Sequence, residues 1–324
     1  MTTSFELRTQ SRSGLRKRAG WFARLLIAIV ALAWLVSLVN PQQIINAWQR
    51  ISPGYFALAS ALWFANLGLQ VYKWHLIINS ASRQVSLRDS ARSLFGSYTL
   101  GIITPGRWGE IGRALFLPGC DWKTVSWLAF FDRATNALAI IFLGAIGFLF
   151  YPALLERAAG SASYTIATIV GLLLLLPVLV VFIPALRRRV AGWLQARYPQ
   201  SAWPQLLHMT PRSGLLLRTS ALAFAFAFVF AVQQVLLVRG FSVGLAMVPG
   251  VFAVFAIHTI KTLLPVSFGD LGIREGTTAL LLASLDVPAA VSVSAALLLF
   301  FINVAIPALI GIPFVLTAKR TEAE

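Results

Sequence analysis

Long runs of hydrophobic residues, separated by short polar stretches, fill most of this chain of 324 residues. A helix needs about 20 consecutive apolar residues to cross a bilayer. Six runs come close to that length, and they cover residues 21–39, 55–78, 125–150, 164–186, 220–238 and 289–317. This pattern predicts an all-α polytopic membrane protein with about six full spans.

Two further apolar stretches, residues 93–117 and 248–285, contain residues that interrupt a helix. Pro105 and Pro265 lie within them, and glycines follow each proline. Because proline and glycine both weaken the helical hydrogen-bond ladder, neither stretch fits one uniform helix. Each is predicted to be a re-entrant helical hairpin, since irregular backbone at membrane depth must be covered by protein or line a cavity. The alternative is that each stretch crosses completely, which gives up to eight apparent spans.

Basic residues set the expected orientation. The segments 1–20, 187–218 and 318–324 contain Lys and Arg beside apolar runs, and such segments stay in the cytoplasm. We therefore expect both termini and the loop at 187–218 to be cytoplasmic. That loop also contains Trp193 and Tyr198, so an amphipathic helix on anionic lipid is the alternative to an ordinary basic loop.

The composition agrees with a membrane protein and excludes other classes. Hydrophobic residues make up 58% of the chain and charged residues 12%, with a mean hydropathy of +0.78, whereas a soluble domain has about 25% charged residues. A soluble enzyme and a disordered chain are excluded, and the single cysteine, Cys120, excludes a disulfide scaffold. The formal charge of +16 does not indicate nucleic acid, because the basic residues flank apolar runs. A signal peptide is the alternative for residues 21–39, but that run is long for one.

The two broken stretches share a motif. The first reads PGRWGEIGR from Pro105, and the second reads PVSFGDLGIR from Pro265. Each has a proline, an aromatic residue, a glycine, an acid, an aliphatic residue and a second glycine at the same spacing, followed by an arginine. Two spans precede each motif and one follows it, so the halves have opposite orientations. The sequence therefore predicts an inverted-topology repeat, residues 21–150 and 151–317, as in many transporters.

Charged residues in or beside these apolar segments form the candidate binding site. An intramembrane charge costs about 2.5–3.5 kcal/mol at a helix centre, so such residues are functional candidates by default. Arginine forks match phosphate oxygens, and glycines let backbone N–H groups approach an anion. The alternative is structural, with ion pairs that fix the hairpins and glycines that permit close packing. The candidate substrate-binding residues are Pro105, Arg107, Gly109, Glu110, Arg113, Asp132, Arg133, Lys261, Pro265, Gly269, Asp270, Gly272, Arg274 and Glu275.

Other polar residues are weaker candidates. Asn66, Gln70 and Asn303 lie in expected spans, where such side chains more often make interhelical hydrogen bonds. His258 lies one helical turn before Lys261 and is a minor candidate for the same cavity. The histidines show no metal-ligand spacing, and the common nucleotide-binding and hydrolase motifs are missing from the sequence. We therefore expect no metal, no cofactor and a non-enzymatic function.

The strings TPGRWGEIGRALFL and LLPVSFGDLGIREGTTALLL resemble the lysylphosphatidylglycerol synthase transmembrane-region family, also called flippase-like membrane proteins. The resemblance covers nearly the whole chain, from about Trp21 to Thr317. It implies a helical bundle with re-entrant segments in the bacterial cytoplasmic membrane, and it places lipid translocation on the shared motif. In multiple peptide resistance factors, a domain of this type is joined to an aminoacyl-transferase domain and moves the modified lipid. No such domain follows here, so lysyl transfer is not carried over.

We therefore expect an integral membrane flippase or transporter that moves an anionic or amphipathic lipid, phospho- or polyisoprenyl-linked, between leaflets. One alternative is an integral-membrane transferase for a lipid-linked substrate, with Glu110 or Asp270 as base. Another is a non-catalytic partner of a lipid-modifying enzyme. The expected partners are membrane lipids and a separate lipid- or glycan-modifying enzyme, and not nucleic acid.

Overall fold

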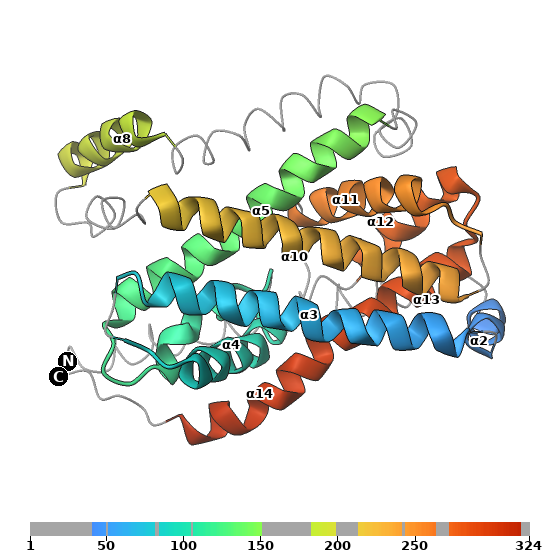
Figure 1. The fold of residues 1–324 in the computed structure, drawn as a ribbon, viewed down its shortest axis with the longest axis horizontal. Helices are drawn as coiled ribbons and strands as arrows, with labels where there is room; N and C mark the ends of the chain where they lie inside the picture. Colours follow the sequence, from blue (N-terminus) through green and yellow to red (C-terminus); the bar gives the residue numbers. More distant parts are fainter. Residues whose placement is uncertain are drawn as a thin grey trace, which may run out of the picture.

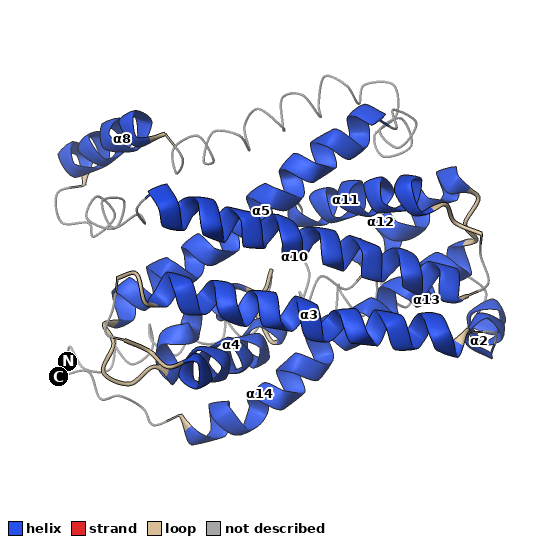
Figure 2. Ribbon diagram, viewed as in Figure 1, coloured by secondary structure: helices blue, strands red, loops and turns tan. Residues whose placement is uncertain are grey.

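The structure is a computed structural model that describes residues 41–49, 51–81, 84–104, 106–150, 183–198, 213–241, 244–263 and 272–318 (Figure 1). Within these ranges every regular element is a helix (Figure 2). The expected span at 21–39, most of the expected span at 164–186 and four candidate site residues lie outside them. Those four are Pro105, Pro265, Gly269 and Asp270.

Four of the six expected spans lie on described helices. The first half contains α2 (Pro41–Gln49), α3 (Pro53–Ile78), α4 (Leu87–Ile102), the 3-10 helix η1 (Trp108–Phe116) and α5 (Trp122–Phe150). The second half contains α8 (Pro184–Arg197), α10 (Ser213–Gly240), α11 (Met247–Leu263), α12 (Ile273–Leu282), the 3-10 turn η2 (Ala283–Leu285), α13 (Ala289–Phe300), the π-helix η3 (Phe301–Ala305) and α14 (Ile306–Thr317). By length and composition, three described segments are able to cross a membrane, namely Trp122–Phe148, Gly214–Gly240 and Ala289–Thr317.

Each broken stretch contains two described helices. In the first, α4 and η1 pack against each other, and in the second α11 packs against α12. Helix α4 has 16 residues and therefore rises about 24 Å, which is less than the roughly 30 Å of a hydrocarbon core. The helix–break–helix form predicted from the prolines and glycines is thus present in the first half, whereas the predicted second break, residues 264–271, lies outside the described residues.

The segment 187–218 is more helical than an ordinary basic loop. Helix α8 begins at Pro184 and follows Ile183, which is extended although it lies within the apolar run expected to reach residue 186. Proline suits the first position of a helix because its missing N–H would be unpaired there. Helix α10 begins at Ser213, so the last residues of the expected loop are already helical.

Two long helices, α3 and α10, pack side by side in the centre of the molecule (Figure 1). They are antiparallel, because the N–H of Ser52 at the start of α3 donates to the carbonyl of Gly240 at the end of α10, at 2.7 Å. Helix α4 follows α3 along the chain and α11 follows α10. The two broken stretches therefore start at opposite ends of this central pair.

The last helix of each half packs on the broken stretch of the other half. Helix α14, at the end of the second half, packs on α4, and α5, at the end of the first half, packs on α11. The Thr99 hydroxyl of α4 donates to the carbonyl of Ala308 at 2.6 Å. The Thr259 hydroxyl of α11 donates to the carbonyl of Ile140 at 3.0 Å. The same kind of contact thus joins the halves twice, with the roles exchanged.

Glycines allow both of these contacts to be close. A Cβ atom on Gly311 of α14 would lie 2.1 Å from the carbonyl oxygen of Phe95. A Cβ atom on Gly147 of α5 would lie 2.6 Å from the carbonyl oxygen of Phe252. Both distances are below van der Waals contact, so a larger residue would push each helix pair apart. Small residues serve this purpose commonly in membrane helix packing.

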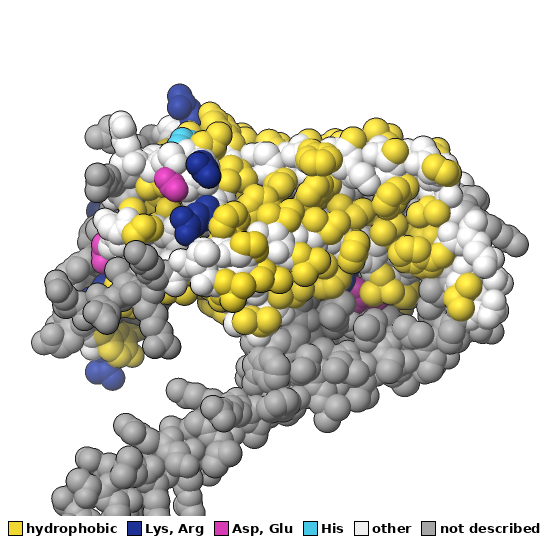
Figure 3. Space-filling model, turned by 90° about the horizontal axis from the view of Figure 1, so that it is seen from below, with side chains coloured by type: hydrophobic (Ala, Val, Ile, Leu, Met, Phe, Trp, Pro, Cys, Tyr) yellow, Lys and Arg dark blue, Asp and Glu magenta, His cyan; other side chains and the backbone are white. Residues whose placement is uncertain are grey.

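The outer surface is apolar over most of the length of the bundle. Figure 3 shows one face on which hydrophobic side chains cover the region between the two ends, whereas Lys and Arg gather near one end. Large apolar side chains are exposed, among them Phe64 at 67%, Leu217 at 74% and Leu316 at 79%. An apolar surface of this extent marks contact with lipid or with another protein.

Candidate functional site

A polar cavity lies where the two halves meet. Its larger lobe has a volume of about 170 Å³ and its smaller lobe about 50 Å³. We call the two lobes together the central cavity, because they share lining residues from α3, α4, α10 and α11 and from the first break. The shared residues are Gln70, Tyr98, Arg107, Phe226 and Lys261.

Arg107 reaches the cavity from an unusual backbone. Gly106 has a φ of 55° and Arg107 a φ of 58°, so the break contains two successive residues in the left-handed region. A residue with a side chain pays about 1–2 kcal/mol to adopt that conformation. The guanidinium lies 5.4 Å from the centre of the Tyr98 ring and forms an ion pair with Glu110. The strained turn thus places a cation in the cavity wall.

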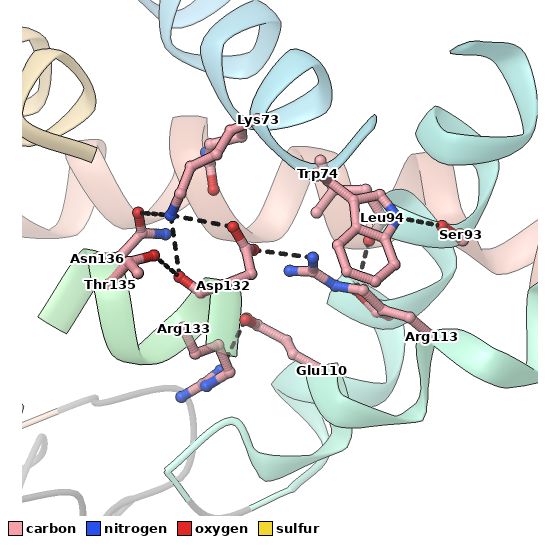
Figure 4. Close-up of polar contacts among 12 residues, drawn as sticks. Lys73, Trp74, Ser93, Leu94, Glu110, Arg113, Asp132, Arg133, Thr135 and Asn136 are labelled. Atoms are coloured by element: carbon pink, nitrogen blue, oxygen red, sulfur yellow. Dashed lines mark hydrogen bonds and ion pairs between the residues drawn. The ribbon is translucent and has the colours of Figure 1, made fainter. Parts of the chain in front are cut away.

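A second arginine stabilises this break from outside. Arg133 of α5 donates to the carbonyls of Gly106 at 3.0 Å and Arg107 at 2.9 Å. It also pairs with Glu110 at 2.6 Å (Figure 4). The carboxylate of Glu110 is therefore engaged by two guanidinium groups, one on each oxygen. These contacts satisfy backbone carbonyls that the break has removed from the helical ladder.

A buried charge triad lies next to the cavity in the first half. Lys73 and Arg113 bind the two oxygens of Asp132 at 3.0 and 2.8 Å (Figure 4). The ammonium of Lys73 also donates to the side chain of Asn136 at 2.5 Å, and the guanidinium of Arg113 stacks on Trp74 at 4.4 Å. None of the three charged residues lines either lobe. The triad joins α3, η1 and α5.

The second half supplies two cations to the cavity wall. Lys261 lies in the last turn of α11, and Arg274 lies in the first turn of α12. The guanidinium of Arg274 pairs with Glu275 and lies 4.7 Å from the centre of the Phe300 ring. Glu275 is fully buried and accepts a hydrogen bond from the N–H of Gly272 at 2.7 Å, which caps the start of α12.

The amino-acid sequence of this chain matches a known family. The model of the lysylphosphatidylglycerol synthase TM region matches residues 21–311, which is most of the chain. The chain belongs to this family. A comparison with curated proteins gave no significant match. Family membership and the apolar helices together make the protein an integral membrane protein with several spans, and they connect it with a lipid-modifying system.

The structure gathers many of the charged residues predicted from the sequence around one cavity. The charged residues that line the central cavity are Arg107, Glu110, Arg133, Lys261 and Arg274. Arg113 and Asp132 lie beside the cavity in the triad. Glu275 pairs with Arg274 and accepts a hydrogen bond from the N–H of Gly272.

Two of the glycine N–H groups expected to face an anion have partners inside the protein. The N–H of Gly109 donates to the Thr104 hydroxyl at 2.7 Å, and that of Gly272 donates to Glu275 at 2.7 Å. A Cβ atom on Gly109 would lie 2.2 Å from the carbonyl oxygen of Leu100. Close packing of η1 on α4 therefore accounts for Gly109.

Sequence reasoning missed Tyr98 and gave little weight to its partner Gln70. The Tyr98 hydroxyl donates to Gln70 at 2.5 Å, and in the second half His258 contacts Gln234 at 2.7 Å. Tyr98 and His258 each lie seven residues before the proline of their half, so aligning the two halves would have found both. His258 packs against the Phe230 ring and does not line the cavity with Lys261.

Proposed function

We propose that this protein is a flippase-type transporter that moves an anionic or amphipathic lipid between leaflets and binds its headgroup in the central cavity. One observation carries the proposal: both broken stretches contribute cations to the same cavity. Arg107 comes from the first break, and Lys261 and Arg274 flank the second. A cavity lined by cations from two halves suits an anionic group that passes between them.

The charge balance favours a negatively charged headgroup. Among the described residues in and beside the cavity, six side chains are cationic and three are anionic, a surplus of three positive charges. The cations are Lys73, Arg107, Arg113, Arg133, Lys261 and Arg274, and the anions are Glu110, Asp132 and Glu275. Charge–charge attraction is strong where water is scarce, and arginine forks bind phosphate oxygens in two-point contacts. A phosphate group therefore fits the wall.

The architecture supports an inverted-topology repeat. Helix α10 begins 160 residues after α3, and α11 begins 160 residues after α4. Since α3 and α10 are antiparallel, the two broken stretches start from opposite ends of the bundle, and residues of both stretches line the central cavity. We propose that they are re-entrant hairpins that approach one site from opposite faces, with both termini in the cytoplasm of a bacterial cell. Loosening one hairpin while the other stays packed would give alternating access.

A transferase reaction with Glu110 as base has less support. Both oxygens of this carboxylate are engaged by arginines, and a general base must instead reach the proton that it removes. A separate lipid- or glycan-modifying enzyme as partner remains part of the proposal, because the family is named for such a system.

The test is lipid translocation in proteoliposomes. Phosphatidylglycerol with a fluorescent acyl chain would be reconstituted with purified protein, and the rate at which the label becomes accessible to dithionite would be measured. Arg107→Gly removes a cation without new backbone strain, because glycine adopts a positive φ freely. We expect at least a tenfold slower rate, or about 1.4 kcal/mol in the barrier, in a protein that still folds because Arg133 continues to pair with Glu110.

Arg197→Ala serves as the control, because this arginine is exposed on α8 and its loss should leave the rate unchanged. Arg107→Lys should restore part of the rate, since it keeps the charge but not the planar fork. Wild-type protein that moves no lipid above the rate of empty vesicles would refute the proposed function.

A further inference from the structure

A chain of buried amides crosses the centre of the bundle and ends at the cavity. Gln233 of α10 donates through Nε2 to the carbonyl of Ala59 at 3.0 Å. Its Oε1 accepts from Nδ2 of Asn303 at 2.9 Å. The Oδ1 of Asn303 accepts from Nδ2 of Asn66 at 3.3 Å. The chain therefore runs from α10 through the π-helix η3 to α3.

The direction of this chain is fixed by its partners. A backbone carbonyl can only accept a hydrogen bond, so Ala59 requires the NH₂ group of Gln233, and the carbonyl of Leu299 requires the NH₂ group of Asn303 at 3.2 Å. Each amide must then present its oxygen to the next NH₂ group. The last group in the chain is the Oδ1 atom of Asn66, which is an acceptor.

This terminal acceptor is buried and meets no donor among the described residues. Asn66 is only 1% exposed and lines the smaller lobe together with Asn303. Arg274 lines the same lobe, and its buried Nε likewise has no hydrogen-bond acceptor in the part of the chain that the structure describes. An unsatisfied buried polar atom costs about 1–3 kcal/mol, which a bound ligand with matching groups would recover.

We propose that the smaller lobe binds the outer end of a phosphodiester headgroup through a hydroxyl group, and that Asn66 is the specificity-determining residue. This inference rests on the proposed function and names the class of lipid. The hydroxyl donates to Oδ1 of Asn66 in the smaller lobe, whose wall also contains Arg274, while Lys261 and Arg107, which line both lobes, contact the phosphate. Glycerol and sugar headgroups belong to this class.

The charge of the wall separates a hydroxyl from an ammonium donor. An ammonium group could also donate to Asn66, but it would lie beside the three cations that line this lobe, Arg107, Lys261 and Arg274. Like charges at such distances repel each other strongly in a poorly solvated site. The lobe therefore selects against ethanolamine and aminoacylated headgroups, even though the family is named for a lysylated lipid.

The size of the lobe agrees with a short hydroxylated arm. One water molecule needs about 10–15 Å³ of such volume, so the lobe of about 50 Å³ holds roughly three to five groups of that size. A two- or three-carbon polyol arm has these dimensions. The larger lobe has room for the phosphate.

The test compares the affinities of three short-chain lipids by calorimetry on purified protein in detergent. The lipids are dihexanoyl phosphatidylglycerol, phosphatidylmethanol and phosphatidylethanolamine. The first carries hydroxyl groups on a phosphodiester, the second lacks them, and the third carries an ammonium. We expect phosphatidylglycerol to bind about tenfold more tightly than phosphatidylmethanol, and phosphatidylethanolamine to bind most weakly.

The substitution Asn66→Ala should reduce this tenfold ratio to about one and leave the affinity for phosphatidylmethanol unchanged. The ratio is independent of the folded fraction, because the same folded molecules bind both lipids. Asn303→Ala provides a second variant, since it frees the Asn66 amide to turn its NH₂ group toward the ligand and should also lower the ratio. Asn46→Ala on the exposed face of α2 is the matched control and should keep it.

A wild-type ratio near one, or a ratio that survives Asn66→Ala, would overturn the inference while leaving translocation of an anionic lipid intact. Tighter binding of phosphatidylethanolamine would overturn it as well. If none of the lipids binds and none is translocated in vesicles, the proposed function fails and the inference fails with it.

Discussion

Replacing Asp132 with asparagine should destabilise the protein more than any other isosteric substitution of a carboxylate in the first half. Asp132 is 4% exposed and is the common partner of Lys73 and Arg113, at 3.0 and 2.8 Å. Asparagine keeps the shape of the side chain. The substitution raises the net charge of the triad from +1 to +2 and leaves two buried cations without a counter-ion.

The expected cost follows from these two distances. At an effective dielectric constant of about 20, unit charges 2.8–3.0 Å apart attract each other by about 5–6 kcal/mol. Desolvation of the ions cancels part of this attraction, and removal of one partner from a buried pair typically costs about 3–5 kcal/mol. We therefore expect Asp132→Asn to cost about 3–5 kcal/mol. Lys73→Met should cost less, about 1–3 kcal/mol, because the pair between Arg113 and Asp132 remains.

The measurement is the rate of thermal inactivation of purified protein in detergent, since membrane proteins of this size often unfold irreversibly. Asp286→Asn is the matched control, because Asp286 is exposed and asparagine tolerates its positive φ of 57°. We expect the control to inactivate like wild type and Asp132→Asn to inactivate much faster. An Asp132→Asn protein with wild-type stability but no translocation would refute the structural role and assign the triad to transport.

Two further predictions concern packing and helix capping. Gly311→Ala should cost about 1–3 kcal/mol, because its Cβ atom would lie 2.1 Å from a carbonyl oxygen of α4. Gly68→Ala on α3 is the control and should be neutral or stabilising, because a Cβ atom there has nothing within 4 Å. Equal melting temperatures for the two variants would contradict the α4–α14 contact. Hydrogen bonds from the Thr124 hydroxyl and backbone N–H lower the pKa of Asp121 below its ordinary value of 3.8. The ionised Asp121 carboxylate therefore stabilises the start of α5 above pH 3.8. This stabilisation is lost as the pH falls through the lower pKa that Asp121 has in the folded protein. Asp121→Ala should thus cost about 0.5–2 kcal/mol at neutral pH, with the difference from wild type shrinking only in strong acid; a difference that shrinks already near neutral pH would contradict the assignment.

Local signals in the sequence were sufficient to place most described helices. The prolines and glycines of the two motifs interrupt a helix by removing a donor or by favouring other backbone angles. The first stretch breaks at Gly106 and Arg107, and in the second α11 ends at Leu263 and α12 begins at Ile273. The π-helix η3 was not predicted. Pro307 has no N–H to donate to the carbonyl of Asn303, and the helix widens there. A hydropathy pattern reads that region as one uniform run.

The partners of the charged residues could not be predicted, because they depend on packing between distant helices. Lys73 lies near the end of an expected span, and from the sequence it reads as a residue at the membrane surface. In the structure it is 1% exposed and pairs with Asp132, 59 positions away. Similarly, Asn66 and Asn303 are 237 positions apart. Hydrophobic periodicity fixes which face of a helix is apolar, but it does not identify the helix that covers it.

The reciprocal contacts between the halves have a consequence for biosynthesis. Helix α4 ends at Ile102, and its partner α14 begins at Ile306, so about 200 residues must be synthesised before α4 can be covered. At about 5–20 residues per second, this takes roughly 10–40 s. During that time the first broken stretch, with its arginines, has to wait beside the translocon or be shielded by an insertase. Packing of the first half is therefore complete only when the last helix arrives. A ribosome that stalls in the second half would leave an incomplete protein whose charged first broken stretch is uncovered, and such a protein is a substrate for membrane quality control.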